Sequence, residues 1–165
     1  IKYERFKMWR LFEDTVGEIL REVTKEKKEC TVAYVDRWPG FKGLDYIVVN
    51  SKSKLGWKVG VQCKRYVGTR IPYCRVDEYS SYTRGTSASK LYDKGMDLKK
   101  RFTNKRKFIL AMFDVYKRSS LQQRRFDWLK DAWDSVVIFN RTRPNEDPYI
   151  YRLRFDELNK IAQWC

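Results

Sequence analysis

An acid, an amide and a lysine fall on two neighbouring predicted strands of this chain. Asp45 is the second residue of the predicted strand Leu44–Asn50, and Gln62 and Lys64 lie in the predicted strand Lys58–Tyr66. Successive side chains of a strand point to opposite faces, so Gln62 and Lys64 share a face. The polar segment between the two runs is short enough for a hairpin, which would bring Asp45 close to both. Oxygen ligands beside a lysine suit the binding of a divalent metal ion and the activation of water.

A helix predicted from about Arg5 to Lys25 adds a carboxylate to this set. Its apolar residues return at helical spacing and form one stripe: Trp9, Phe12, Val16, Ile19, Leu20 and Val23. At about 100° per residue, Glu13 falls on the border of the stripe, whereas Glu18 falls on the far side. A carboxylate at that border can reach the edge of the sheet that the helix covers. Glu13 is therefore the candidate fourth site residue, and the alternative is a solvated boundary glutamate.

The other elements predict an α/β fold with a central mixed β-sheet flanked by helices. The predicted strands are Thr31–Trp38, Leu44–Asn50, Lys58–Tyr66, Phe108–Phe113, Ser135–Asn140 and Tyr149–Leu153. The later predicted helices are Ala88–Phe102, which follows a hydroxyl-rich stretch over 79–87, Leu121–Trp133 and a short helix from Phe155. The 165 residues suit a single domain, 1–165, with the core motifs in about 5–115 and a C-terminal strand and helix extension over about 135–165.

The charge balance favours a polyanion as partner. Lysine and arginine number 36 against 21 aspartate and glutamate, a net charge of +15. Such an excess neutralises phosphates and gives salt-sensitive affinity for nucleic acid. The basic residues also cluster, most densely at 99–101, 105–107, 117–118 and 124–125. The alternative is that these residues only keep the protein soluble.

The chain has no histidine, and its cysteines at 30, 63, 74 and 165 have no CxxC spacing. Common zinc sites and serine–histidine or cysteine–histidine nucleophiles are therefore excluded, and any chemistry must use carboxylates, lysine and a hard metal ion. Buried thiols are the ordinary state of intracellular cysteines, although a high-temperature source would allow disulfides. No apolar run approaches the roughly 20 residues of a membrane span, and the first residues lack a secretion signal. We expect an intracellular, cytoplasmic protein, in the host cytoplasm if the source is a virus.

The motifs together resemble the PD-(D/E)XK nuclease superfamily and, within it, the Mrr-like restriction endonuclease catalytic domain. The resemblance covers about residues 5–80 and is carried by Phe12-Glu13, Gly43-Leu44-Asp45 and Val61-Gln62-Cys63-Lys64-Arg65-Tyr66. The glutamine form followed by Arg-Tyr is typical of the Mrr-like branch. The resemblance implies a restriction-endonuclease-like core and Mg²⁺-dependent hydrolysis of phosphodiester bonds in DNA, with Mn²⁺ able to substitute and no organic cofactor.

The expected roles follow from the chemistry of the side chains. Asp45 and Glu13 would supply carboxylate ligands to the metal ion, and the Gln62 carbonyl would be a neutral third ligand. Lys64 would orient the attacking water or stabilise charge that develops at phosphorus. Because Gln62 stands where a carboxylate is usual, the set has one negative charge fewer, and metal affinity should be weaker.

Basic and aromatic residues after the predicted site strand are candidates for phosphate contacts that position the duplex without reading its sequence. The predicted DNA-binding residues are Arg65, Tyr66, Arg70, Arg84, Lys90, Lys99, Lys100 and Arg101, with Lys94 on the same predicted helix. The alternative for the helix residues is an ordinary solvated face.

The sequence thus predicts a metal-dependent DNA endonuclease, with a structure-selective, junction-resolvase-like enzyme as one form. Alternatives are a non-catalytic DNA-binding protein that keeps the nuclease fold, and a scaffolding protein whose basic face meets nucleic acid incidentally. A small nuclease needs two active sites to cut both strands of a duplex, so we expect a homodimer.

Overall fold

The computed structural model describes residues 2–66, 88–102, 105–114, 127–140 and 155–165. The hydroxyl-rich stretch 79–87, the predicted strand 149–153 and the first part of the predicted helix 121–133 lie outside these ranges. Among the described residues, no helix is long and apolar enough to cross a membrane.

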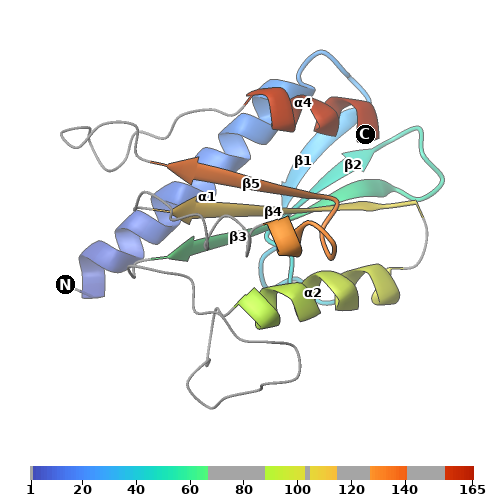
Figure 1. The fold of residues 1–165 in the computed structure, drawn as a ribbon. Helices are drawn as coiled ribbons and strands as arrows, with labels where there is room; N and C mark the ends of the chain where they lie inside the picture. The colour runs from blue at the N-terminus through green and yellow to red at the C-terminus, as the bar shows by residue number, and fades with distance from the viewer. Residues whose placement is uncertain (1, 67–87, 103–104, 115–126, 141–154) are drawn as a thin grey trace.

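The described residues form a mixed five-stranded sheet with helices on both faces (Figure 1). The strands lie in the order β1-β2-β3-β4-β5; the pairs β1/β2 and β2/β3 are antiparallel, whereas β3/β4 and β4/β5 are parallel. The elements are α1 (Lys2–Thr24), β1 (Cys30–Tyr34), β2 (Tyr46–Asn50), β3 (Trp57–Tyr66), α2 (Ala88–Arg101), β4 (Lys107–Asp114), β5 (Ser135–Asn140) and α4 (Phe155–Trp164). The predicted α/β class with a mixed sheet is confirmed.

Two predicted strands are shorter than expected, and one helix prediction is wrong at its end. The chain turns after Tyr34 because the Trp38 amide donates to the Val35 carbonyl at 2.9 Å, so β1 does not reach Trp38. Strand β2 begins at Tyr46 instead of Leu44. The helix predicted to Trp133 ends by residue 129, and turns lead from there into β5.

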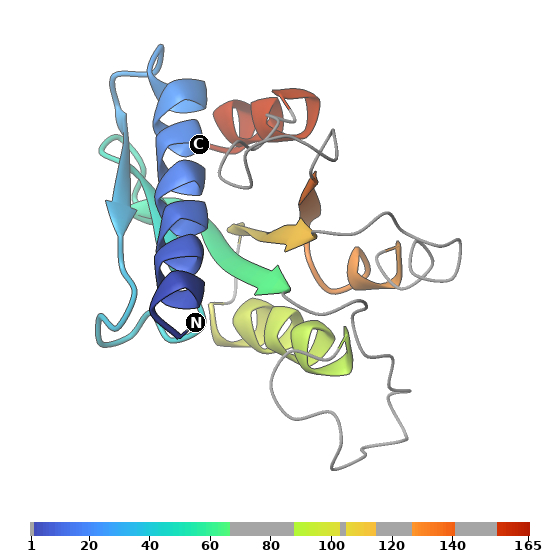
Figure 2. The same ribbon diagram turned by 90° about the vertical axis from the view of Figure 1, so that its left-hand side faces the viewer.

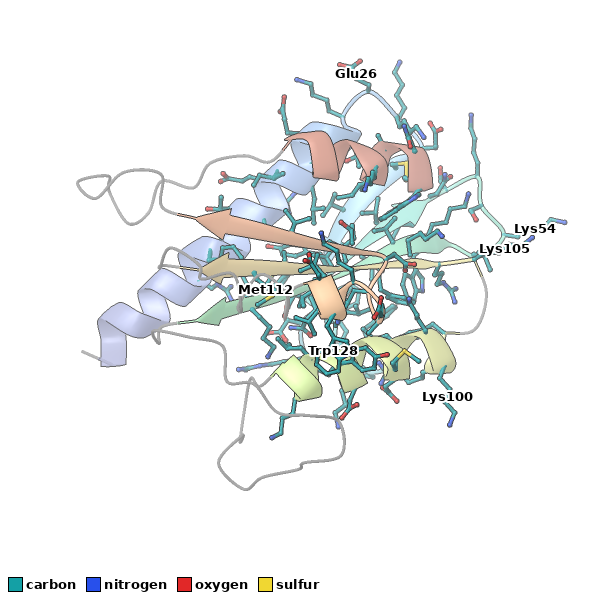
Figure 3. All side chains as sticks on the ribbon, in the orientation of Figure 1. Glu26, Lys54, Lys100, Lys105, Met112 and Trp128 are labelled. Carbon is teal, nitrogen blue, oxygen red and sulfur yellow. A yellow bond between two sulfur atoms is a disulfide. The ribbon has the colours of Figure 1, made fainter. Side chains whose placement is uncertain are left out.

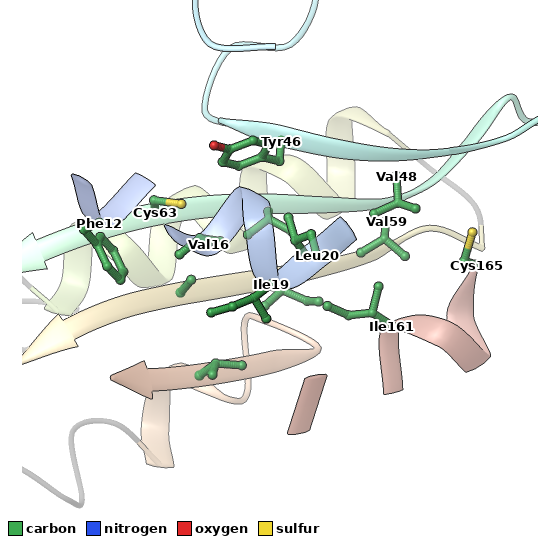
Figure 4. Packing of buried hydrophobic residues seen from close by; sticks show 14 residues of the cluster. Phe12, Val16, Ile19, Leu20, Tyr46, Val48, Val59, Cys63, Ile161 and Cys165 are labelled. Carbon is green, nitrogen blue, oxygen red and sulfur yellow. The ribbon is translucent and has the colours of Figure 1, made fainter. Parts of the chain in front are cut away.

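The two faces of the sheet carry separate apolar clusters. Helices α1 and α4 cover one face and α2 covers the other (Figures 1 and 2). On β3, Val59, Val61 and Cys63 point toward α1, as their alternation predicts, and pack with Phe12 and Leu20 (Figure 4). The α2 face is filled by the other cluster, whose fully buried members include Leu91, Leu98, Leu110, Met112 and Trp133. Gln62 and Lys64 therefore come from β3 on the side of the sheet that α2 covers.

A disulfide joins the start of β1 to the end of the chain. Cys30 and Cys165 are bonded across 135 residues of sequence, and the Asn50 side-chain amide donates to the Cys165 carbonyl at 3.0 Å. Cys63 is a buried free thiol, and Cys74 lies outside the described residues. The bond therefore ties the C-terminal end of α4 to the start of β1.

Replacing Cys165 by serine should lower the free energy of unfolding by about 2–4 kcal/mol, because the disulfide restricts a long loop in the unfolded chain. Denaturation in guanidinium with and without a reductant measures the effect. The matched control is Cys63→Ser, which should still respond to the reductant, whereas Cys165→Ser should not. Equal stability of native and Cys165→Ser protein under oxidising conditions would contradict the prediction.

Candidate metal and phosphate site

Asp45 lies at the edge of the sheet where β2 begins and β3 approaches its end. Its backbone amide donates to the Val61 carbonyl at 2.9 Å, which places it opposite Gln62. Its carboxylate oxygen Oδ2 accepts hydrogen bonds from the Cys63 amide at 2.7 Å and from Gln62 Nε2 at 2.9 Å. The carboxylate thus satisfies a backbone donor of β3, and this fixes its position.

Glu13 reaches this edge from α1, and its side chain is 2% exposed, so it is not a solvated boundary residue. The Tyr46 hydroxyl donates to the backbone carbonyl of Glu13 at 2.8 Å. One turn further along the helix, a Cβ at Gly17 would lie 2.5 Å from the same hydroxyl oxygen. The absence of a side chain at Gly17 therefore allows α1 to lie close to β2 and to deliver Glu13.

A third carboxylate, Asp36, completes the cluster and was not predicted. One carboxylate oxygen from each of Glu13, Asp36 and Asp45 lies within 4.8 Å of the others. The Tyr34 hydroxyl lies 3.2 Å from Glu13 Oε1 and 3.2 Å from Asp36 Oδ2. The antiparallel pairing of Tyr34 with Tyr46 puts Asp36 beside Asp45. A correct prediction of this strand pairing would have identified Asp36 as a site residue.

Desolvation dominates the electrostatics of the cluster. Burial and the neighbouring Asp45 charge raise the pKa of Glu13 to about 7. Burial also raises the pKa of Asp45 to about 6, although the hydrogen bond from the Cys63 amide and the Lys64 charge act in the opposite direction. The Tyr34 hydroxyl has one hydrogen, so it can donate a hydrogen bond to only one of the two carboxyl groups. The other carboxyl must be protonated to donate to the Tyr34 oxygen, and the raised pKa of Glu13 agrees with this.

The donor set fits a hard divalent cation. Carboxylate oxygens are the ligands that Mg²⁺ prefers, and the three oxygens, within 4.8 Å of one another, are close enough to bind a single ion. The Gln62 amide nitrogen donates to Asp45 Oδ2 at 2.9 Å and to the Cys63 carbonyl at 3.0 Å, and the expected role of the Gln62 carbonyl oxygen as a neutral ligand stays a prediction. Asp36 supplies the negative charge that Gln62 lacks.

Lysines approach the cluster from the α2 side. Lys64 is half-buried, and its charge opposes the rise that burial causes in the pKa of Asp45. The predicted grouping of Asp45, Gln62 and Lys64 is therefore present at one edge of the sheet. Lys94 of α2, expected among the basic residues of this helix as a phosphate contact or part of a solvated face, is half-buried and interacts with Lys64 and Asp45.

The predicted DNA-binding residues differ in their surroundings: some extend into solvent, and others pair with neighbouring segments. Lys100 extends from α2 into solvent (Figure 3). Lys99 pairs with Asp134 at 3.8 Å, and the Arg101 guanidinium donates to the Lys42 carbonyl, so these two also hold α2 to neighbouring segments. Lys90 is half-buried. Arg70 and Arg84 lie outside the described residues. Arg65 and Tyr66 are the last two residues of β3, and the structure describes only their backbone.

Comparison of the chain with protein-family models, curated proteins and solved structures gives no match. The assignment of a function therefore depends on the geometry above.

Gly17→Ala should destabilise the protein by about 1–3 kcal/mol, because the added methyl group meets the Tyr46 ring and hydroxyl. At an ordinary helix position the same change stabilises by about 0.5–1 kcal/mol, so the sign of the effect is diagnostic. Chemical denaturation measures it. Glu18→Ala, one residue further on the exposed side of α1, is the control and should change stability by less than about 0.5 kcal/mol. A more stable Gly17→Ala protein would show that α1 does not lie this close to β2.

The metal-free protein should lose stability as the pH rises from about 4 to 7. The folded-state pKa values of Glu13 and Asp45 are raised to about 7 and about 6, so the folded state binds protons that the unfolded state has released. Ordinary carboxyls titrate at about pH 4, but the chain has no histidine, so few other groups titrate between about pH 5.5 and 7. Thermal melting in chelator at several pH values measures the slope, which should be smaller in Glu13→Gln than in the control Glu18→Gln.

Mg²⁺ or Mn²⁺ at about 100 times its dissociation constant should raise the melting temperature at pH 7.5 by about 5–10 °C, and by less at pH 5, where the carboxyls hold protons. A melting temperature that neither cation changes at pH 7.5 would count against a metal site here.

Proposed function

We propose that this protein is a metal-dependent DNA endonuclease that hydrolyses phosphodiester bonds. The observation that carries the proposal is the placement of Glu13, Asp36 and Asp45 at one edge of the sheet with Lys64 beside them. The order of elements supports a restriction-endonuclease-like core: a helix, three antiparallel strands, a second helix and a parallel strand. The net charge of +15 supports a polyanionic substrate.

The three carboxylates would hold Mg²⁺, with Mn²⁺ as a substitute. When bound, the ion polarises the phosphate and lowers the pKa of a coordinated water. The hydrogen bonds from Gln62 and the Cys63 amide keep the Asp45 carboxylate in place. Tyr34 bridges Glu13 and Asp36, and burial raises its own pKa, so it remains a donor.

In the proposed reaction, a water oxygen forms a bond to phosphorus while one phosphorus–oxygen bond to a sugar breaks. The water loses a proton to solvent, and the departing sugar oxygen takes one up. The Lys64 ammonium group, whose charge acts on Asp45, would stabilise negative charge on the phosphate oxygens. The site stands where the parallel strands β3 and β4 approach their carboxyl ends, an edge at which open α/β sheets often bind ligands.

Cleavage of supercoiled, linear and four-way-junction DNA with Mg²⁺ or Mn²⁺ tests the proposal. Asp45→Asn, Asp36→Asn and Lys64→Met should each lower the rate by about 10²-fold or more at equal folded concentration. Glu18→Gln, exposed on α1, is the control and should cut as the native protein does. Loss of cutting in Asp36→Asn would separate this site from one built only from Asp45, Gln62 and Lys64. A preference for the junction would identify a structure-selective enzyme.

One observation favours a second function, a DNA-binding protein without turnover. Gln62 uses its amide nitrogen on Asp45 and offers no negative charge to a metal ion. Native protein that binds these DNAs in a salt-dependent manner, yet cuts none with either cation, would overturn the endonuclease proposal in favour of this one. A homodimer that carries two sites for the two strands belongs to the endonuclease proposal, and light scattering in solution checks it.

A further inference from the structure

Lys94 lies on the side of α2 that faces the sheet. Its helical neighbours Leu91 and Leu98, three residues before it and four after it, are each 1% exposed and belong to the apolar cluster beneath α2. The rotation of the helix is fixed because the Trp133 indole donates to the Leu91 carbonyl at 2.9 Å, and a Cβ at Gly95 would lie 2.8 Å from the Trp133 indole nitrogen. The half-buried Lys94 side chain must therefore run toward β3.

This position is unfavourable for stability. Lys94 meets Lys64, and burial together with that neighbour lowers the pKa of Lys94 to about 8. Lys42, from the segment between β1 and β2, adds a further positive charge, and Asp45 is the acid that acts in the opposite direction. Lysines from three separate segments thus gather on the α2 side of the carboxylate cluster. Two ammonium groups held together are favourable only when an anion lies between or beside them.

We propose that Lys94 is a second phosphate-contacting lysine, which binds a non-bridging oxygen of the scissile phosphate together with Lys64. This inference deepens the proposed endonuclease function and rests on it. The carboxylates would hold the metal on one side of the phosphate, and the two lysines would contact it from the other. Lys94 makes and breaks no covalent bond in this role; its ammonium group compensates the charge that grows on the phosphate oxygens as water attacks.

The decisive variant is Lys94→Met, which keeps the length of the side chain and removes its charge. We expect kcat for cleavage to fall about 10²-fold with Mn²⁺, while Mn²⁺ binding to the DNA-free protein stays within threefold of native. The melting temperature should be unchanged or higher, because a half-buried like charge beside Lys64 is removed. Lys94→Arg, which keeps the charge, should recover most of the lost rate.

Lys160→Met is the matched control, since Lys160 is exposed on α4, on the opposite face of the sheet. It should cut DNA at the native rate. If Lys94→Met cuts within threefold of native while Lys64→Met is inactive, the endonuclease stands and the role of Lys94 is wrong. If Lys94→Met loses melting temperature and Mn²⁺ binding together with activity, Lys94 is a structural residue, which also overturns the inference. If the native protein cuts none of the DNAs, both the proposed endonuclease function and the proposed role of Lys94 are wrong.

Discussion

The burial of carboxylates at one edge of the sheet is the constraint on which the rest of this structure depends. Desolvation raises the pKa values of Glu13 and Asp45, so the cluster opposes folding near neutral pH unless protons or a cation neutralise it. Holding these acids together requires several elements at once. The Tyr46 hydroxyl and the space at Gly17 bring α1 to the sheet, and the Cys63 amide fixes Asp45. Such an arrangement is better explained by function than by stability.

The segment between β1 and β2 links two of the acids. Asp36 and Asp45 stand near its two ends, and the Val35 amide closes it by donating to the Asp45 carbonyl at 2.8 Å. Arg37, directly after Asp36, has a positive φ of 66°, a conformation that a non-glycine residue adopts at some energetic cost. Near the other end, Gly43 has a φ of 92°, which glycine adopts freely. Backbone geometry, rather than the length of a side chain, thus sets the spacing of the two carboxylates.

The basic residues fall into two groups: arginines that bind backbone carbonyls, and lysines that lie near the carboxylate cluster. Arg106 donates to the carbonyls of Leu55 and Trp57, each at 3.0 Å, and Arg101 donates to the Lys42 carbonyl, so both connect segments of the scaffold. Lys64 and Lys94 instead approach the carboxylates. Net charge by itself therefore does not identify which basic residues would contact a polyanionic partner. Glu13 thus reaches the candidate site from α1, and Lys94 reaches it from α2.

The sequence by itself determined the α/β class, nearly all of β3, α2, β4 and β5, and the nearness of Asp45, Gln62 and Lys64, because period-two alternation and a short hairpin are local properties. Helical periodicity also singled out Glu13. Only the tertiary structure decided the place of Asp36, which depends on how β1 pairs with β2, and the inward direction of Lys94, which depends on Trp133. It also joined Cys30 to Cys165. Those contacts link residues far apart in the chain, and no local pattern encodes them.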